Sequence, residues 1–242
     1  MKFFRTTRQT SLTEKKIAKY LIYAIGEIIL VVIGILIALQ VNNLNENRLI
    51  EELEISLLKE MKDNLRSDIE DIKINIGIHQ RSIQSAKIIL NSFDNELPDK
   101  DTLNMHYGKV GMIPRYLMTE NAYSSMKKEG MRIIQNYSLK NAITNHYENA
   151  FSFLRAWSEA EWDTWREDQR ELYRKHFKSF ILFNDLVPAD YDDLSTNSEY
   201  KNYLNNRIAW LTKTIKIYEN GGIRNTENLI GLIEKEIKNR EK

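Results

Sequence analysis

A continuous apolar stretch near the N-terminus dominates the pattern of hydrophobic and polar positions. Residues 20–41 read YLIYAIGEIILVVIGILIALQV, and Glu27 is the only carboxyl side chain among them. A helix of this length rises about 30 Å, which matches the hydrocarbon core of a bilayer. Cleaved signal peptides have a shorter apolar core, of about 7–15 residues, and a clearer small-residue cleavage site than IALQVNN offers. We therefore predict an uncleaved transmembrane helix at 20–41.

After this stretch the apolar residues become periodic, in steps of three and four. They fall at Ile50, Leu53, Leu57, Met61, Leu65, Ile69, Ile72 and Ile76, and again at Ile83, Ala86, Leu90 and Phe93. Such steps are typical of amphipathic helices and coiled coils. They predict a long membrane-proximal helix over 42–94, locally weakened at Gly77. The Asn-rich residues 42–48 either kink this helix or mark the outer membrane interface, because Asn is a poor helix former.

The remaining residues, 95–242, show no convincing alternation of a strand, and the whole chain has only three Pro and nine Gly. We expect helices at about 102–108, 119–129, 139–183, 197–219 and 226–240. Thr119 is the expected N-cap of the second, Gly130 its end, and Ser195 or Thr196 the caps of the fourth. The predicted fold is all-α: a transmembrane helix, a long helix, and an antiparallel helical bundle at 95–242 that part of the long helix completes.

The first 19 residues are strongly basic. They contain six Lys and Arg residues against Glu14 alone, a net charge of +5, whereas the whole chain carries only +1. Because Lys and Arg beside a membrane span favour the cytoplasmic side, residues 1–19 should form a cytoplasmic tail. Residues 42–242 would then lie outside the cytoplasm. A nucleic-acid-binding arm is the weaker interpretation, since the apolar span follows directly.

Five residues of the span share one helical face. Steps of four, three, four and three separate Glu27, Val31, Gly34, Ala38 and Val41. Gly34 and Ala38 form a small-x-x-x-small pair, which lets two membrane helices approach closely, although such pairs are also frequent in any apolar span. A carboxylate at the bilayer centre costs about 2.5 kcal/mol or more, and packing against a partner or protonation would reduce that cost for Glu27. The five residues therefore predict a packing stripe.

Two segments resemble a known family. Residues 19–48, KYLIYAIGEIILVVIGILIALQVNNLNENR, and more loosely residues 122–148, AYSSMKKEGMRIIQNYSLKNAITNHYE, resemble the uncharacterised domain of unknown function 6090 family of bacterial inner-membrane proteins. The resemblance implies a single-span anchor in the inner membrane, a mostly helical periplasmic part and no assigned activity. It supplies no catalytic residue.

The sequence contains no recognisable catalytic motif. It has no Cys, which excludes disulfides, Cys-ligated zinc and a cysteine nucleophile. Its four His, at positions 79, 106, 146 and 176, lie far apart, and none follows a Glu by three positions as in carboxylate-bridged iron bundles. The G-x-S-x-G, P-loop and H-E-x-x-H patterns are absent, and a Ser-His-Asp triad is unsupported. We expect no enzyme activity, cofactor or metal site.

Two clusters of side chains need an interpretation. Segment 155–168, RAWSEAEWDTWRED, places Trp162 and Trp165 three positions apart, so they can lie together on one side of a helix. We interpret them as an aromatic cluster of the core rather than a cage for a cation. Segment 184–193, NDLVPADYDD, is rich in Asp but lacks the order of a calcium loop, which favours a polar helix connection.

Three functions are compatible with these features. The favoured one is a membrane-tethered interaction or assembly module, which presents its helical bundle and packs through the stripe against a second copy or another membrane protein. The alternative is a subunit of an ion-driven membrane complex that uses Glu27 to handle protons, an analogy of topology alone. An enzyme is the third. The expected partners are the lipid bilayer and another membrane helix, and no nucleic acid.

Overall fold

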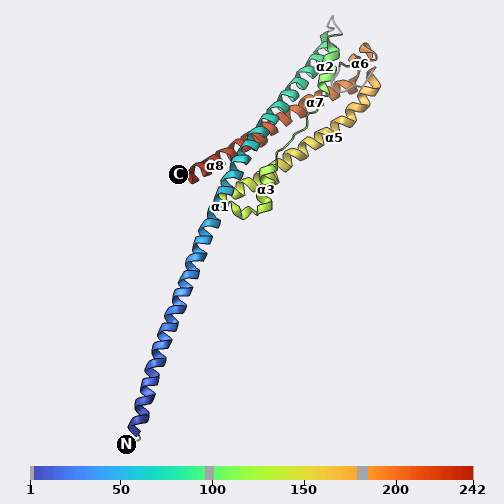
Figure 1. The fold of residues 1–242 in the computed structure, drawn as a ribbon. Coiled ribbons are helices and arrows are strands. Elements are labelled where there is room, and N and C mark those ends of the chain that lie inside the picture. The colour runs from blue at the N-terminus through green and yellow to red at the C-terminus, as the bar shows by residue number, and fades with distance from the viewer. Residues whose placement is uncertain (1–2, 96–100, 179–184, 242) are drawn as a thin grey trace. The chain divides into compact units, whose positions relative to one another are not determined.

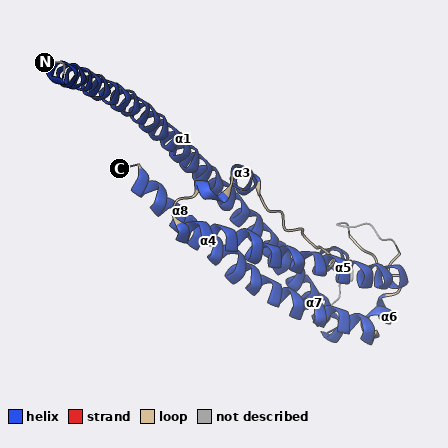
Figure 2. Cartoon of the chain, turned by 90° about the horizontal axis from the view of Figure 1, so that it is seen from below, coloured by secondary structure: helices blue, strands red, loops and turns tan. Residues whose placement is uncertain are grey.

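Helices make up almost all of the protein (Figure 1). The structure is a computed structural model that describes residues 3–95, 101–178 and 185–241, with side chains from Tyr20 onward. These residues contain no strand, only an isolated bridge between Phe177 and Pro188, and Figure 2 shows helix in every long element. The α-helices are α1 (Phe3–Asn95), α2 (Leu103–Val110), α3 (Asn121–Glu129), α4 (Tyr137–Asn145), α5 (Phe151–His176), α6 (Tyr191–Thr196), α7 (Ser198–Ile217) and α8 (Asn225–Arg240). The prediction of an all-α fold that begins with a long helix is confirmed.

The chain divides into two units, Met1–Leu53 and Glu54–Lys242, and α1 contributes to both. Unit 1 contains the first part of α1 and no other element. The helix continues through the Asn-rich residues 42–48, so this segment does not end it. Every side chain from Tyr20 to Leu49 is exposed. Unit 1 is thus a single helix whose apolar surface is open on all sides.

In unit 2, the second part of α1 buries the apolar face that its periodicity indicates. The buried residues of this face are Leu57, Met61, Leu65, Ile69, Ile72 and Ile76. Beyond Gly77 the buried face differs from the apolar pattern, because Ser82, Ser85 and Ser92 turn inward. Buried hydroxyl groups need hydrogen-bond partners. Ser82 Oγ donates to the Val110 carbonyl at 2.8 Å, and Ser92 Oγ donates to the Ile89 carbonyl at 2.6 Å.

Three helical stretches lie side by side in unit 2, namely residues 54–95 of α1, α5, and α7 followed by α8 (Figures 1 and 2). Ion pairs give their directions. Glu161–Arg207 and Lys175–Glu199 join α5 to α7. Arg66–Glu234 joins α1 to α8, and Lys59–Glu241 joins α1 to the residue that follows α8. Both sets require α7 and α8 to run antiparallel to the other two stretches. Since α1 and α5 run the same way, the chain between them must return along the unit.

An extended segment, residues 112–120, forms this return between α2 and α3. We call it the strap. It leads into α3, which ends before Gly130 as predicted, and Gly130 adopts a φ of 93° that other residues rarely tolerate. Thr119, in contrast, is not the N-cap of α3. Glu120 occupies that position, and the Thr119 backbone N–H donates to α1 instead.

Two further helix boundaries differ from their predictions. The helix expected at 139–183 is divided into α4 and α5 by a π-helical turn at His146–Ala150, and α5 ends at His176. Ser195 and Thr196 are not N-caps, because they are the last two residues of α6. The cap of α6 is Asp190, and that of α7 is Asn197, whose side-chain oxygen accepts from the Tyr200 backbone N–H. Short polar side chains cap helices interchangeably, so their position alone does not identify the cap.

The loop expected between the last two helices is also helical. Residues Tyr218–Arg224 form a π-helical turn that joins α7 to α8 despite two successive glycines. A Cβ atom at Gly222 would lie 2.9 Å from Ile72 Cδ1, so the missing side chain lets this turn approach α1 closely. Gly222 therefore serves packing rather than a change of chain direction.

Candidate functional site

The apolar residues of unit 1 form a helix long enough to cross a membrane, by length and composition. Glu27, Val31, Gly34, Ala38 and Val41 all lie on it, and each is exposed. A Cβ atom added at Gly34 would meet no heavy atom within 4 Å. Helical spacing places the five residues on one face. Unit 1 thus offers an uncovered apolar surface with a carboxyl group and small residues along one side.

In unit 2, two carboxylates of α1 hold the strap. Asp71 Oδ2 accepts a hydrogen bond from the Leu117 backbone N–H at 3.2 Å, and Asp68 Oδ1 accepts one from the Thr119 backbone N–H at 3.0 Å. Asn75 Nδ2 donates to the strap carbonyl of residue 115 at 3.2 Å. An extended segment outside a sheet lacks backbone partners, so side chains of α1 supply them here.

A fully buried arginine of α7 fixes the beginning of the strap. Arg207 Nη2 donates to the Met112 carbonyl at 2.9 Å, and its Nε donates to the Val110 carbonyl at 3.4 Å. Its Nη1 donates to Glu161 Oε1 of α5 at 3.1 Å, and Glu161 is itself buried. A guanidinium group has a planar arrangement of donors, so several fixed acceptors lock its position.

Burial shifts the pKa values of the ionisable groups around these anchors. It raises the pKa of Asp68 from 3.8 to about 6, although the hydrogen bonds from Thr119 oppose the rise. Burial, and secondly the charge of Arg207, lower the pKa of His79 to about 3. His79 is therefore neutral at pH 7, although its Nε2 lies 3.8 Å from Glu161 Oε2. Burial also raises the pKa of Glu161, while Arg207 opposes this rise.

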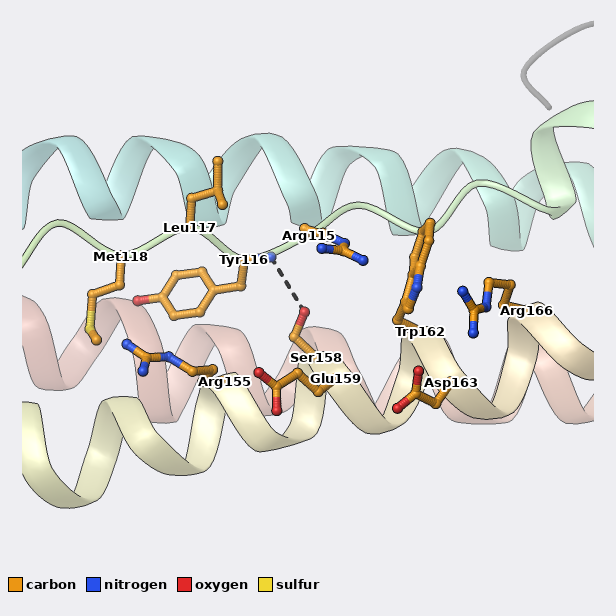
Figure 3. Close-up of a pocket in the computed structure, with 10 residues that line it drawn as sticks. All are labelled: Arg115, Tyr116, Leu117, Met118, Arg155, Ser158, Glu159, Trp162, Asp163 and Arg166. Atoms are coloured by element: carbon orange, nitrogen blue, oxygen red, sulfur yellow. Dashed lines mark hydrogen bonds between the residues drawn. The ribbon is translucent and has the colours of Figure 1, made fainter.

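A groove of about 550 Å³ lies between the strap and one face of α5 (Figure 3). Its lining residues are Arg115, Tyr116, Leu117 and Met118 of the strap and Arg155, Ser158, Glu159, Trp162, Asp163 and Arg166 of α5. The two walls are joined by a hydrogen bond of 3.3 Å from the Tyr116 backbone N–H to Ser158 Oγ. The volume falls within the range of about 300–1,000 Å³ that is common for small-molecule sites.

Trp162 lies between two guanidinium groups of this groove. The Arg115 guanidinium carbon is 4.6 Å from the centroid of the indole ring, and that of Arg166 is 5.8 Å away. Figure 3 shows the two groups on opposite sides of the ring. Cations are attracted to the face of an aromatic ring, so Trp162 orients both side chains.

Trp165, the other member of the predicted aromatic pair, is buried and has different neighbours. Its ring centroid lies 5.7 Å from that of Tyr203 and 6.3 Å from that of Trp210, both on α7. A third tryptophan of α5, Trp157, stacks on Trp210, with 4.7 Å between the ring centroids. Within the described part of the chain, no ring contact links Trp162 to Trp165, although both border the same apolar core.

The histidines and the Asp-rich segment do not gather into a metal site in the part of the chain that the structure describes. His79 and His146 are buried, and burial lowers the pKa of His146 to about 4. Asp190 caps α6 by accepting hydrogen bonds from the backbone N–H groups of Asp192 and Asp193. Residue 184 of the Asp-rich segment lies outside the described residues.

Comparison with known families decides the affiliation of the chain. The model of the family of unknown function DUF6090 matches residues 27–204. The chain belongs to this family. The resemblance inferred from residues 19–48 and 122–148 is confirmed, and the DUF6090 region contains both the stripe of unit 1 and the groove of unit 2. No curated protein and no solved structure matches the chain.

The sequence-based reasoning missed the buried polar centre of this DUF6090 member. A usable signal exists in the helical period, because Arg207 follows Tyr203 and Leu204 and precedes Leu211 at steps of three and four. The neighbours of Arg207 in this series are buried, as it is. A charged residue at such a core position is rare unless it is paired. Glu161 shows the same signal between the buried Ser158 and Trp165.

Proposed function

We propose that the protein is a single-pass anchor of the bacterial inner membrane, which presents unit 2 in the periplasm as an interaction module. The observation that carries this proposal is the exposure of every apolar side chain from Tyr20 to Val41. An apolar surface of this length is stable only if something covers it, and lipid of matching thickness does so. Membership of the DUF6090 family is compatible with this role but assigns none.

The basic tail supports the proposed orientation. Residues 1–19 carry a net charge of +5, and positively charged flanks are retained in the cytoplasm. The C-terminal end of the span lacks a comparable positive cluster, since residues 42–47 contain Glu46 and no Lys or Arg. The charge difference between the two flanks therefore favours a cytoplasmic N-terminus.

The stripe supports assembly as the purpose of the anchor. Glu27 projects from the same face as Gly34 and Ala38, so a second helix packed there would cover the carboxyl group and remove it from lipid. The partner is either a second copy of the chain or another membrane protein. Buried polar groups on membrane helices are favoured where they face a protein partner, which makes this face the proposed contact.

Site-specific labelling tests the anchor and its orientation. The chain has no Cys, so single cysteines can be introduced without a background. Ser11→Cys lies in the tail, and Ser125→Cys is exposed in unit 2. A membrane-impermeant maleimide added to cells with a permeabilised outer membrane should label Cys at 125, and should label Cys at 11 only after lysis. The reverse pattern contradicts the orientation, and recovery of both variants in the soluble fraction contradicts the anchor.

A further inference from the structure

The groove of unit 2 contains charges of both signs that do not neutralise one another. Arg155 is paired with Glu120, which leaves four charged lining residues: Arg115, Arg166, Glu159 and Asp163. Within the described part of the chain, none of these four forms an ion pair, and the guanidinium groups of the two arginines lie over the faces of the Trp162 ring. In Figure 3 the strap supplies Arg115 to one wall, and α5 supplies Glu159, Asp163 and Arg166 to the opposite wall.

The strap that carries Arg115 is held by buried polar groups. Asp68 is almost fully buried and unfavourably charged where it holds Thr119, and Arg207 is withdrawn from water to hold Met112. Apolar side chains often replace a buried ion pair without loss of stability, so stability alone does not explain such anchors. They define one position of the strap, and therefore one spacing between the charged walls of the groove.

We propose that this groove binds a zwitterionic small molecule, a free amino acid or a short peptide with both ends free. Arg115 binds the ligand carboxylate, and Glu159 with Asp163 binds the ligand ammonium group. Tyr116 and Met118 of the strap, whose side chains project toward α5 in Figure 3, provide apolar contact for a small side chain. Charge-assisted hydrogen bonds would form at both ends of the ligand. The strap is already held in place, so binding costs little entropy for ordering the protein.

Other classes of ligand fit the same groove less well. A simple anion would be attracted by the arginines but repelled by Glu159 and Asp163, and a simple cation would meet the opposite difficulty. A flat aromatic ligand would have to displace Arg115 from the face of Trp162, where the guanidinium lies 4.6 Å from the ring centroid. A ligand with both charges can instead pair with unpaired groups of both signs, Arg115 at one end and Glu159 with Asp163 at the other.

Calorimetric titration of the full chain in detergent micelles tests the proposal with three matched probes. Dialanine carries both charges, N-acetyl-dialanine only the carboxylate, and dialanine amide only the ammonium group. We expect dialanine to bind and each single-charge analogue to bind about tenfold more weakly or worse. Equal binding of an analogue would identify a simple anion or cation site and overturn the proposal. So would the absence of binding by all three probes.

Substitutions in the groove locate the binding. Arg115→Gln and Asp163→Asn should each weaken dialanine binding about tenfold. Arg170→Gln and Glu167→Gln are exposed on the same helix α5 outside the groove and should leave it unchanged. Thermal unfolding of each variant separates lost binding from lost fold, and Asp163→Asn leaves the strap untouched. Wild-type affinity in both groove variants would overturn the proposal.

Discussion

Two parts of one helix, α1, differ in the exposure of their side chains. Residues 20–49 expose every side chain, although most of the first 22 are apolar. Residues 54–95 bury one apolar face, a row of serines and the carboxylates of Glu54 and Asp68, and leave most of their other charged side chains in water. The helix assignment is the same in both parts. The two parts therefore differ in what surrounds their side chains and not in their backbone structure.

The largest expected effect comes from placing lysine in the exposed apolar surface of unit 1, and lysine at an exposed apolar position of unit 2 provides the comparison. Leu36 is 58% exposed in unit 1, and Ile74 is 62% exposed in unit 2. If lipid surrounds the first, Leu36→Lys should cost about 3 kcal/mol of insertion free energy, and Leu30→Lys about as much again. The double variant should leave the membrane pellet after an alkaline carbonate wash.

Ile74→Lys is the matched control for this comparison. It should stay in the pellet and change the free energy of unfolding by no more than about 0.5 kcal/mol, because water already surrounds the side chain. If the Leu30 and Leu36 lysine variant also stays in the pellet, then the exposed apolar surface of unit 1 is not a membrane anchor.

The buried ion pair of unit 2 gives the next largest effect. Arg207→Met leaves Glu161 buried without its partner and should lower the free energy of unfolding by about 3–5 kcal/mol in urea titrations. Adding Glu161→Leu should restore most of that loss. Lys175→Met breaks the exposed pair with Glu199 and should leave the urea midpoint unchanged. If Arg207→Met and Lys175→Met lowered the free energy of unfolding equally, burial would not explain the contribution of the Arg207–Glu161 pair.

The pH dependence of unit 2 should change with Asp68→Asn. Because the pKa of Asp68 is about 6 in the folded protein and 3.8 as a free side chain, the folded state binds the proton more tightly between these values. Asp68 therefore contributes stability at low pH that is lost as the pH rises through 6, up to about 3 kcal/mol. The variant should be more stable than wild type at pH 7 and equally stable near pH 4.

Urea midpoints measured at both pH values would show this difference. Asp63→Asn, an exposed position on the same helix, should shift neither midpoint. His79 and His146 act in the opposite direction, because their lowered pKa values remove stability as the pH falls below 6.5. For this reason the prediction concerns the difference between variant and wild type. A difference in urea midpoint between variant and wild type that is the same at pH 4 and pH 7 would contradict the prediction.

The smallest effects come from two glycines, one in each unit. Gly222→Val should destabilise unit 2 by about 1–3 kcal/mol, because the added Cβ would lie only 2.9 Å from Ile72 Cδ1. Gly34→Val should leave the unfolding of unit 2 unchanged, since nothing lies within 4 Å of its Cβ. It should instead reduce crosslinking through a cysteine at Ala38, if the stripe packs against a partner. Crosslinking that is equal with and without Gly34→Val contradicts the stripe.

The sequence was informative wherever one helical face is apolar. The steps from Leu57 to Ile76 predicted a helix and coincide with its buried face, because burial of apolar residues produces that period. Beyond Gly77 the pattern again predicted the helix but only part of its buried face, since Ala86 is buried while Ser82 and Ser92 also enter the core by donating to backbone carbonyls. Whether a serine finds such a carbonyl depends on the position of α2 and on the neighbouring turn of α1, which local periodicity does not describe.

The groove was less accessible to prediction than the fold. Its walls come from the strap and from α5, which are joined by residues that lie far apart in the sequence, such as Tyr116 and Ser158. Trp162 was recognised as an aromatic residue of interest, but its partner Arg115 lies 47 positions earlier. Contacts between residues so far apart in the sequence follow from how the helices pack, and local patterns in a single sequence do not reveal them.

The hydrogen bonds of Arg207 have a consequence for the order in which the molecule is built. Its carbonyl partners, Val110 and Met112, were synthesised 97 and 95 residues earlier. A chain emerging N-terminus first must therefore keep the strap incompletely held until α7 arrives, because long loops close late. A chain truncated before α7 would therefore lack both of these hydrogen bonds at the beginning of the strap.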